Sequence, residues 1–404
     1  MRVLQVAPRY APAWAYGGGV RMSFELGKEL VERGHRVTAF ASDQLDERHR
    51  FEVLEERIDG VDIRRFPNRS HALAARFPFV FFRPRGLRAA IAALNGSIDV
   101  VHLFESRGPH VRWTAQLLPP QGIPFVWSAY GGLAGGVGIR RLYRGAYDRV
   151  YDTRGAVQAA AGLIAQTPHE RDVYRGFGAK DDRIRLIPLG VNWDEFAQLP
   201  ELGGFRSRIG VGDRAKIILF VGRIHPTKGL ELLLQAFALA RRQVAEAHLV
   251  AVGWDHGHLT TVRGLSRSLG VANAVTFCAP IFGADRLAAY VDADVFAITP
   301  PVFEETSLAA LEAAASGTQC VLTRQCEILG LEASGAGRVV EYDREAIAAA
   351  LIESLQPGVR ERRGRQARAM VATRFTSSAV AREHERFYEE VLARQTQETG
   401  RRRA

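Results

Sequence analysis

The chain has few cysteines and no long apolar run, and each absence excludes a class of protein. Only Cys278, Cys320 and Cys326 occur in 404 residues, without the paired spacing of a zinc site. A disulfide-stabilised secreted domain is therefore excluded, and the odd count predicts free thiols in a reducing cytosol. No run approaches the roughly 18 apolar residues that a membrane span needs. The chain also opens on an apolar strand pattern rather than a secretory signal.

Low-complexity tracts and short repeats are absent too, so the composition is that of a folded globular protein. Hydrophobic residues make up 47% and charged residues 24% of the chain. Its 404 residues suffice for two domains of ordinary size. The formal net charge of +10 predicts an anionic partner, which can be a nucleotide, a phospholipid or a nucleic acid.

One segment lacks acidic residues altogether. Between Ile63 and Ile98 there are seven arginines, five phenylalanines and no Asp or Glu. Basic and aromatic side chains together suit an anionic membrane surface or a lipid phosphate, and we assign a candidate membrane contact to residues 64–88. The same mixture can bind single-stranded nucleic acid. In a third interpretation, the phenylalanines pack inside and the arginines are solvated.

The dinucleotide signature G-x-G-x-x-G is missing from the first half, although a related junction is present. VLQVA at 3–7 predicts a buried strand, followed by Gly17–Gly19, a helix over Val20–Arg33 and a second strand. Glycines at such a βαβ junction let backbone amides approach a phosphate. Met22 occupies the place of the third glycine. Asp43, near the end of the second strand, keeps a nicotinamide-dependent enzyme as an alternative.

A later strand of the first half, IDVVHLFESRG, ends in polar residues. Ligands collect at the carboxyl ends of parallel strands. His102, Glu105 and Arg107 are therefore candidates for contacts with an acceptor or a sugar. For His102 the alternative is a structural role inside the protein.

The second half places two cations at a strand–helix junction. AKIILFVGRI predicts a strand that ends at Arg223, and Lys228 precedes Gly229 just before a predicted helix. Two cations that converge near a helix start can neutralise a diphosphate.

Residues 303–317, FEETSLAALEAAASG, predict a second such junction. Glu304 lies in the loop, and Glu312 lies beside the apolar face of the predicted helix. A carboxylate next to a core is costly without partners, so Glu312 indicates a ligand rich in hydroxyl groups. The free amides that begin the helix form an anion site, at Thr306, Ser307 and Leu308.

The G-R-x4-K-G and E-x7-E patterns together resemble those of glycosyltransferase family 4. The resemblance implies a GT-B fold of the α/β class, with two Rossmann-like parallel-sheet domains facing a central cleft. It implies an acceptor-side domain at 1–195, completed by a returning helix at 378–404, and a nucleotide-sugar-binding domain at 196–377.

The resemblance also implies roles at the donor. Arg223 and Lys228 would stabilise the diphosphate, and Glu304 would hold sugar hydroxyls, so that these three form the catalytic set. Glu312 would bind the ribose. The further donor-binding residues implied are Gly18, Gly19, Gly253, Ile281, Thr306, Ser307 and Leu308.

On the acceptor side, the resemblance points to the polar strand ends and to Tyr130. Many family members have a histidine at this last position, where it contacts the donor sugar. A phenol cannot act as a protonated imidazole, so Tyr130 departs from the pattern. The implied substrate-binding set is His102, Glu105, Arg107 and Tyr130.

The expected function is retaining transfer of a hexose from a UDP- or GDP-sugar to a lipid-linked, polysaccharide or small-molecule acceptor. No metal or further cofactor is expected, because Asp292-Ala293-Asp294 leads into a strand and is interpreted as structural. The expected location is cytoplasmic, with contact to the inner membrane face through 64–88 and a role in cell-envelope or polysaccharide biosynthesis. No nucleic-acid partner is expected. The alternatives are a basic nucleic-acid- or membrane-binding protein and a GT-B sugar-nucleotide epimerase.

Overall fold

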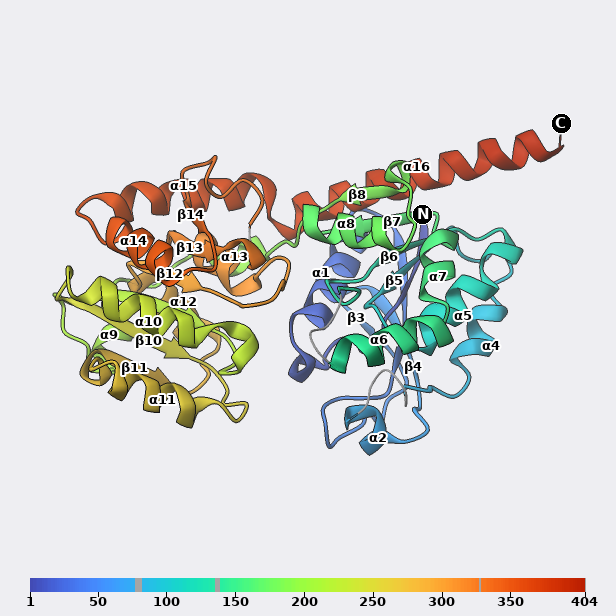
Figure 1. Cartoon of the computed structure of the whole chain (residues 1–404). Helices are drawn as coiled ribbons and strands as arrows, with labels where there is room; N and C mark the ends of the chain where they lie inside the picture. The colour runs from blue at the N-terminus through green and yellow to red at the C-terminus, as the bar shows by residue number, and fades with distance from the viewer. Residues whose placement is uncertain (77–81, 135–138, 327, 404) are drawn as a thin grey trace. The chain divides into compact units, whose positions relative to one another are not determined.

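The structure, a computed structural model, describes residues 1–76, 82–134, 139–326 and 328–403, without the side chains of 75–76, 139–141 and 398–403. The chain forms two compact units (Figure 1). Unit 1 comprises Met1–Leu189 and Ser377–Ala404, and unit 2 is the continuous stretch Gly190–Thr376. The chain thus crosses between units at 189/190 and 376/377, where the sequence predicts crossings at 195/196 and 377/378.

Unit 1 is built on an eight-stranded sheet. Its order is β3 (Glu55–Ile58), β4 (Val61–Phe66), β2 (Arg36–Ser42), β1 (Arg2–Val6), β5 (Val100–Phe104), β6 (Phe125–Ser128), β7 (Gly162–Ala165) and β8 (Ile184–Leu186). β3 pairs antiparallel with β4, and the other neighbours pair in parallel. β5, β6 and β7 are buried throughout, as expected of parallel strands that are covered on both faces.

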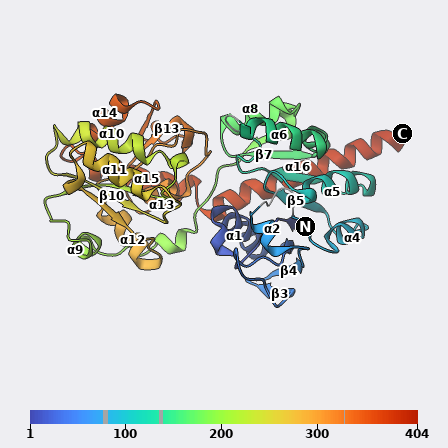
Figure 2. The same ribbon diagram turned by 60° about the horizontal axis from the view of Figure 1, so that its bottom comes forward.

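Helices cover the two faces of this sheet (Figures 1 and 2). Apolar residues of α1 and α16 join the core on one face, and those of α4, α5, α7 and α8 join the core on the other. The helices of unit 1 are α1 (Gly18–Glu32), α2 (His71–Arg76), α4 (Leu87–Ala92), α5 (Pro109–Leu117), α6 (Ile139–Val150), α7 (Thr153–Ala159), α8 (Pro168–Gly176) and α16 (Ser377–Arg403). Short 3-10 helices lie at η1 (Trp14–Tyr16), η2 (Pro119–Gln121) and η3 (Asp181–Arg183).

The last helix, α16, is an integral part of unit 1. Phe387, Tyr388 and Val391 are buried in the core that α1 shares. At its surface, Glu385 forms an ion pair with Arg33 and a hydrogen bond with His35 at 2.8 Å. The apolar contacts hold the helix on the sheet, and these polar contacts connect it with the residues that follow α1.

Unit 2 contains a six-stranded parallel sheet. Its order is β11 (Val275–Cys278), β10 (Ala247–Val252), β9 (Lys216–Val221), β12 (Val295–Ile298), β13 (Cys320–Thr323) and β14 (Gly337–Val340). Its helices are α9 (Gly204–Arg208), α10 (Leu230–Arg241), α11 (Leu259–Ser268), α12 (Gly283–Asp292), α13 (Leu308–Ala315), α14 (Arg344–Ser354) and α15 (Val359–Arg374), with 3-10 turns η4 (Trp193–Phe196), η5 (Pro226–Lys228), η6 (Ala272–Ala274) and η7 (Arg324–Cys326).

The strand order of unit 2 reverses between β9 and β12, because β10 and β11 lie on one side and β13 and β14 on the other. In open parallel sheets, ligands bind at the carboxyl ends of strands at such a reversal. In unit 1 the corresponding reversal lies between β1 and β5. Two α/β units with parallel sheets confirm the predicted fold class.

Candidate active site

In unit 2, the loops that follow β9 and β12 bring Lys228 and Glu304 together. Lys228 Nζ donates a hydrogen bond to Glu304 Oε2 over 2.7 Å, and the two side chains are only 20% and 15% exposed. The backbone N–H of Glu304 donates to Gln325 O at 2.8 Å, which fixes the loop beside η7. A cation and a carboxylate that the sequence predicts at one site therefore lie in contact at the strand reversal.

Glycines permit this close packing of loops. A Cβ at Gly229, where φ is +73°, would lie 1.5 Å from Thr299 O at the end of β12. A Cβ at Gly253 would lie 1.8 Å from Gly222 O, beside the end of β9. Arg223 follows Gly222 and is exposed at this edge. Gly253 thus shapes the backbone on which Arg223 is presented.

Helix α13 begins where the sequence predicts a helix start. Ser307 is the N-cap, and its Oγ accepts the N–H of Ala310 at 3.4 Å. Leu308 is the first helical residue, and Thr306 precedes the cap with its side chain buried. Glu305 has φ of +61° and is buried, so the chain turns sharply between Glu304 and the helix.

Glu312 on α13 has protein partners that the sequence does not predict. Arg286 Nη1 donates to Glu312 Oε1 at 3.0 Å, and the Tyr290 hydroxyl donates to Oε2 at 2.9 Å. Arg286 Nη2 also reaches Glu195 Oε2 at 2.6 Å. Arg286 and Tyr290 lie four residues apart on α12, a spacing that places them on one helix face. That spacing was the available signal, but only the fold brings α12 beside α13.

Electrostatics keep these partners in fixed protonation states. Burial alone would lower the pKa of Arg286, but the charge of Glu312, with further contributions from Tyr290 and Glu195, leaves this pKa above its ordinary value. Burial raises the pKa of Tyr290 well above its ordinary value, and Glu312 raises it further. Glu312 therefore faces a permanent cation and a neutral hydroxyl donor.

Ile281 lies just after β11, the edge strand that neighbours β10. The N–H of Gly253 donates to Cys278 O at 3.2 Å, so the strand ends that carry Ile281 and Gly253 are joined. The predicted donor-binding residues of unit 2 thus belong to the ends of four adjacent strands, β11, β10, β9 and β12, and to α13.

In unit 1, Gly19, Glu105 and Tyr130 lie together at the strand reversal. A Cβ at Gly19 would lie 3.7 Å from Tyr130 Cδ2 and 3.9 Å from Glu105 Oε1. Gly18 is the first residue of α1, so both glycines belong to its amino-terminal turn. Glu105 follows β5 and Tyr130 follows β6, as the sequence predicts for the polar residues of these strand ends.

The environments of Glu105 and Tyr130 raise the pKa of both side chains. Burial raises the pKa of Glu105 above its ordinary value, against the opposing charge of Arg9. Burial also raises the pKa of Tyr130, with contributions from Glu170 and Glu105, so its phenol stays neutral. Tyr130 can donate or accept a hydrogen bond but carries no charge.

His102 is a core residue in the structure. Its ring has no exposed surface, and its nitrogens bond to the Tyr388 hydroxyl at 2.6 Å and to Ser128 Oγ at 2.8 Å. It lies within β5 rather than beyond its end, and it faces α16. The alternative of a structural role therefore describes His102, and the predicted substrate contact is corrected.

Arg107 is also engaged inside unit 1. It is 5% exposed, and its guanidinium bonds twice to Asp148, at 3.0 and 2.8 Å, and once to Gly132 O. These bonds fix the loop after β6 to α6. Arg107 therefore supports the loop that carries Tyr130, and its guanidinium already has an anionic partner.

In the described part of segment 64–88, the phenylalanines are buried, whereas Arg64, Arg69, Arg83, Arg85 and Arg88 are exposed. Phe66 and Phe82 are buried, and the Arg65 side chain, fully buried, pairs with Glu56 and donates to Ala11 O. Phe77, Phe79 and Phe81 lie outside the described residues. No helix of the described chain is both long enough and apolar enough to cross a membrane.

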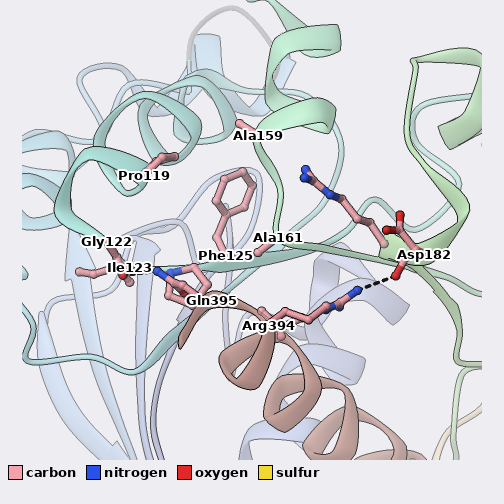
Figure 3. A pocket seen from close by; sticks show the side chains of 12 residues that line it. Pro119, Gly122, Ile123, Phe125, Ala159, Ala161, Asp182, Arg394 and Gln395 are labelled. Carbon is pink, nitrogen blue, oxygen red and sulfur yellow. Dashed lines mark hydrogen bonds between the residues drawn. The ribbon is translucent and has the colours of Figure 1, made fainter. Parts of the chain in front are cut away.

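A separate hollow of about 410 Å³ lies at the opposite edge of the unit 1 sheet, between the starts of β6 and β7 and α16 (Figure 3). Phe125, Val391 and Arg394 contribute to its lining, and Arg394 Nη1 donates to Asp182 O at 2.6 Å. None of the predicted site residues lines this hollow.

Within the described residues, no three His, Cys, Asp or Glu side chains gather as metal ligands would. Asp292, the first acid of the D-x-D pattern, accepts the backbone N–H groups of Gly203, Phe205 and Arg206. Asp294 accepts the N–H of Ile217 at 2.7 Å and pairs with Arg360 at 3.2 Å. Both acids therefore have structural partners within unit 2.

The fold of two α/β units, each on a largely parallel sheet, is that of the GT-B class of proteins, as the similar solved structures show. The sequence model of Glycosyltransferase Family 4 matches residues 16–195, and that of Glycosyl transferases group 1 matches residues 215–357. The chain belongs to glycosyltransferase family 4 and is therefore a glycosyltransferase.

Individual relatives agree with this assignment. A D-inositol 3-phosphate glycosyltransferase of Geodermatophilus obscurus is 28% identical over 94% of this chain and 84% of the relative. Sucrose-phosphate synthase from Thermosynechococcus elongatus has the same fold, with a TM-score of 0.75 at 21% identity over 97% of this chain and all of that one. Anabaena Alr3699/HepE, solved in complex with UDP, has a TM-score of 0.71 at 16% identity over 96% of this chain and all of that one.

Proposed function

We propose that this glycosyltransferase transfers a hexose from a UDP- or GDP-sugar to a hydroxylated acceptor, with retention and without a metal ion. The observation that carries the proposal is the contact of Lys228 with Glu304 at the strand reversal of unit 2, one loop away from α13 and Glu312. Adjoining elements thus carry the three groups that the donor needs. Lys228 would bind the phosphate, Glu304 the sugar hydroxyls and Glu312 the ribose.

The chemistry follows from these groups. An acceptor hydroxyl oxygen forms a bond to the anomeric carbon while the bond from that carbon to the diphosphate oxygen breaks on the same face. The hydroxyl proton passes to the departing diphosphate. Arg223, Lys228 and the first amides of α13 would stabilise the charge that grows on this leaving group. Glu304, held by Lys228, would fix the sugar hydroxyls.

For the acceptor, the relatives suggest which compounds to test first. The Geodermatophilus obscurus relative is a D-inositol 3-phosphate glycosyltransferase, so inositol phosphates are the first acceptors to test. Lipid-linked and polysaccharide acceptors, which would serve cell-envelope biosynthesis, come second. At the edge of unit 1, Glu105 and Tyr130 are the groups that would contact acceptor hydroxyls.

The proposal includes peripheral membrane contact through 64–88, made by its exposed arginines, since Phe66 and Phe82 are buried. Cosedimentation with vesicles of phosphatidylglycerol or phosphatidylcholine tests it. Binding that requires the anionic lipid and falls with salt supports the contact.

The function is tested by incubating the protein with UDP-, GDP- and ADP-hexoses and an acceptor panel. Release of a nucleoside diphosphate that depends on both donor and acceptor is expected, and the anomeric proton coupling of the product reports retention. Conversion of the nucleotide sugar without an acceptor would favour an epimerase. Binding of a polyanion that persists in Glu312→Ala, with no transfer at all, would favour a basic binding protein.

A further inference from the structure

The segment that enters unit 2 is fastened to the helix that carries Glu312. The N–H of Val191 donates to Phe375 O at 2.8 Å, so the entering and leaving segments of unit 2 lie side by side. η4 follows directly, with Asn192 as its N-cap. Two arginines from different helices then connect η4 with α13.

The first connection runs through Arg286 on α12. Its guanidinium bridges Glu312 on α13, at 3.0 Å, and Glu195 in η4, at 2.6 Å. The Arg286 and Glu312 side chains are each 15% exposed, so water screens this connection less than it would a surface ion pair. A shift of the Glu312 carboxylate therefore acts on Glu195 through one rigid, planar group.

The second connection runs through Arg368 on α15. Its Nη2 donates to Phe196 O at 2.7 Å, and its Nη1 donates to Ala315 O at the end of α13. The same guanidinium lies over the Trp193 ring, 4.7 Å from its centroid. Arg368 therefore holds both ends of η4 against the carboxyl end of α13.

The packing of α15 makes the second connection stiff. A Cβ at Gly364 would lie 2.2 Å from Gly317 O, so α15 approaches the end of α13 at backbone distance. Arg368 lies one helical turn after Gly364, and its anchor point is thereby fixed.

We infer that nucleotide binding at Glu312 reduces the conformational freedom of residues 190–197, and that Arg286 and Arg368 carry this effect. Arg286 acts as the positioning residue of Glu312. This inference rests on the proposed function, because it takes Glu312 as the ribose contact. A carboxylate has about four lone-pair sites, so Glu312 can accept ribose hydroxyls while it keeps Arg286 and Tyr290. The bound ribose then removes freedom from the carboxylate, from Arg286 and from η4 together.

Amide hydrogen exchange with and without UDP tests the inference. In the unaltered protein, UDP at about 100 times its Kd is expected to slow exchange over both 308–316 and 190–197, by up to about 100-fold under mass action. GDP serves as the probe if UDP does not bind. Protection of 308–316 without protection of 190–197 would overturn the inference and leave the proposed function intact. Binding of neither nucleotide would overturn both.

Matched variants locate the connection. Arg368→Met removes the hydrogen bonds to Ala315 and Phe196 and leaves Glu312 untouched. It is expected to keep the Kd for UDP within about threefold while losing most of the protection of 190–197. Arg365→Met, on an exposed turn of the same helix, should behave as the unaltered protein. Full protection of 190–197 in Arg368→Met would contradict the role of this arginine.

Glu195→Ala gives an independent test, because it removes both carboxylate oxygens of the 30% exposed Glu195 and so breaks the hydrogen bond from Arg286. We expect UDP to protect 190–197 less than in the unaltered protein, whereas 308–316 remains protected. Unchanged protection at both segments would show that the Arg286 bridge transmits nothing.

Discussion

Lys228 Nζ lies 2.7 Å from Glu304 Oε2, although 76 positions separate the two residues in sequence. The contact exists because β9 and β12 are neighbours in the sheet and their loops leave the same edge. Each group holds the other in place. A donor phosphate arriving at Lys228 and sugar hydroxyls arriving at Glu304 would find both side chains already oriented.

Removing the cation of this pair tests its role in transfer. Lys228→Ala is expected to reduce kcat by about 100- to 1000-fold, because it removes one charge-stabilising donor at the leaving group. Transfer assays with the preferred donor provide the measurement. Arg214→Ala, in an exposed loop of unit 2, is the matched control and should keep full activity. A decrease in kcat of less than about threefold in Lys228→Ala would remove this residue from the catalytic set.

Neutralising Glu312 should weaken nucleotide binding. Glu312→Gln is expected to raise the Kd for UDP or GDP by roughly 10- to 100-fold, since a hydrogen bond to a charged group contributes about 1.5–3 kcal/mol. Calorimetric titration measures this change. Glu361→Gln, exposed on α15, is the control. An unchanged Kd in Glu312→Gln would separate this acid from the nucleotide.

Adding a methyl group at Gly229 should damage the fold of unit 2. The new Cβ would meet Thr299 O at 1.5 Å on a backbone with φ of +73°, so the loop must move. Gly229→Ala is expected to lower the free energy of unfolding by about 3 kcal/mol or more. Gly264→Ala is the control, because that position, inside α11, has open space around its Cβ. It should gain about 0.5–1 kcal/mol from helix propensity. Equal stabilities of the two variants in urea would contradict the reported packing.

Acid should destabilise unit 1 through its buried histidines. Burial lowers the pKa of His384 to about 4 from an ordinary 6.5, and it lowers the pKa of His102 as well. The unfolded chain therefore binds protons more readily than the folded one, and stability falls as the pH drops from about 6.5 towards 4. For His384 alone, the loss between pH 7 and pH 5 is about 1–2 kcal/mol. Urea unfolding at the two pH values should show a smaller difference in His384→Asn.

The sequence predicted the elements around Lys228 and Glu304 because their patterns are local. An apolar strand, a glycine and a capped helix each leave a signal within about ten residues. The resemblance then placed the two junctions in one site. The prediction that His102 contacts substrate was wrong for a physical reason. The position of His102 in β5 does not reveal that Tyr388, far along the chain, covers it.

Arg286 was missed for a related reason. Its spacing to Tyr290 marks one helix face, but only the packing of α12 beside α13 shows that this face meets Glu312. Arg107 likewise donates to Asp148, a partner 41 positions away that the sequence does not predict. The protein partners of a charged side chain determine whether it is available to a ligand. A single sequence does not reveal these partners.

The late position of α16 has a consequence for synthesis. Unit 2 is one uninterrupted stretch, so it can fold on the ribosome as soon as residue 376 has emerged. The sheet of unit 1, made first, keeps the apolar face under Phe387 and Tyr388 uncovered until the final helix arrives. A chain truncated before Ser377 would thus combine a finished unit with an unfinished one whose bare face invites aggregation.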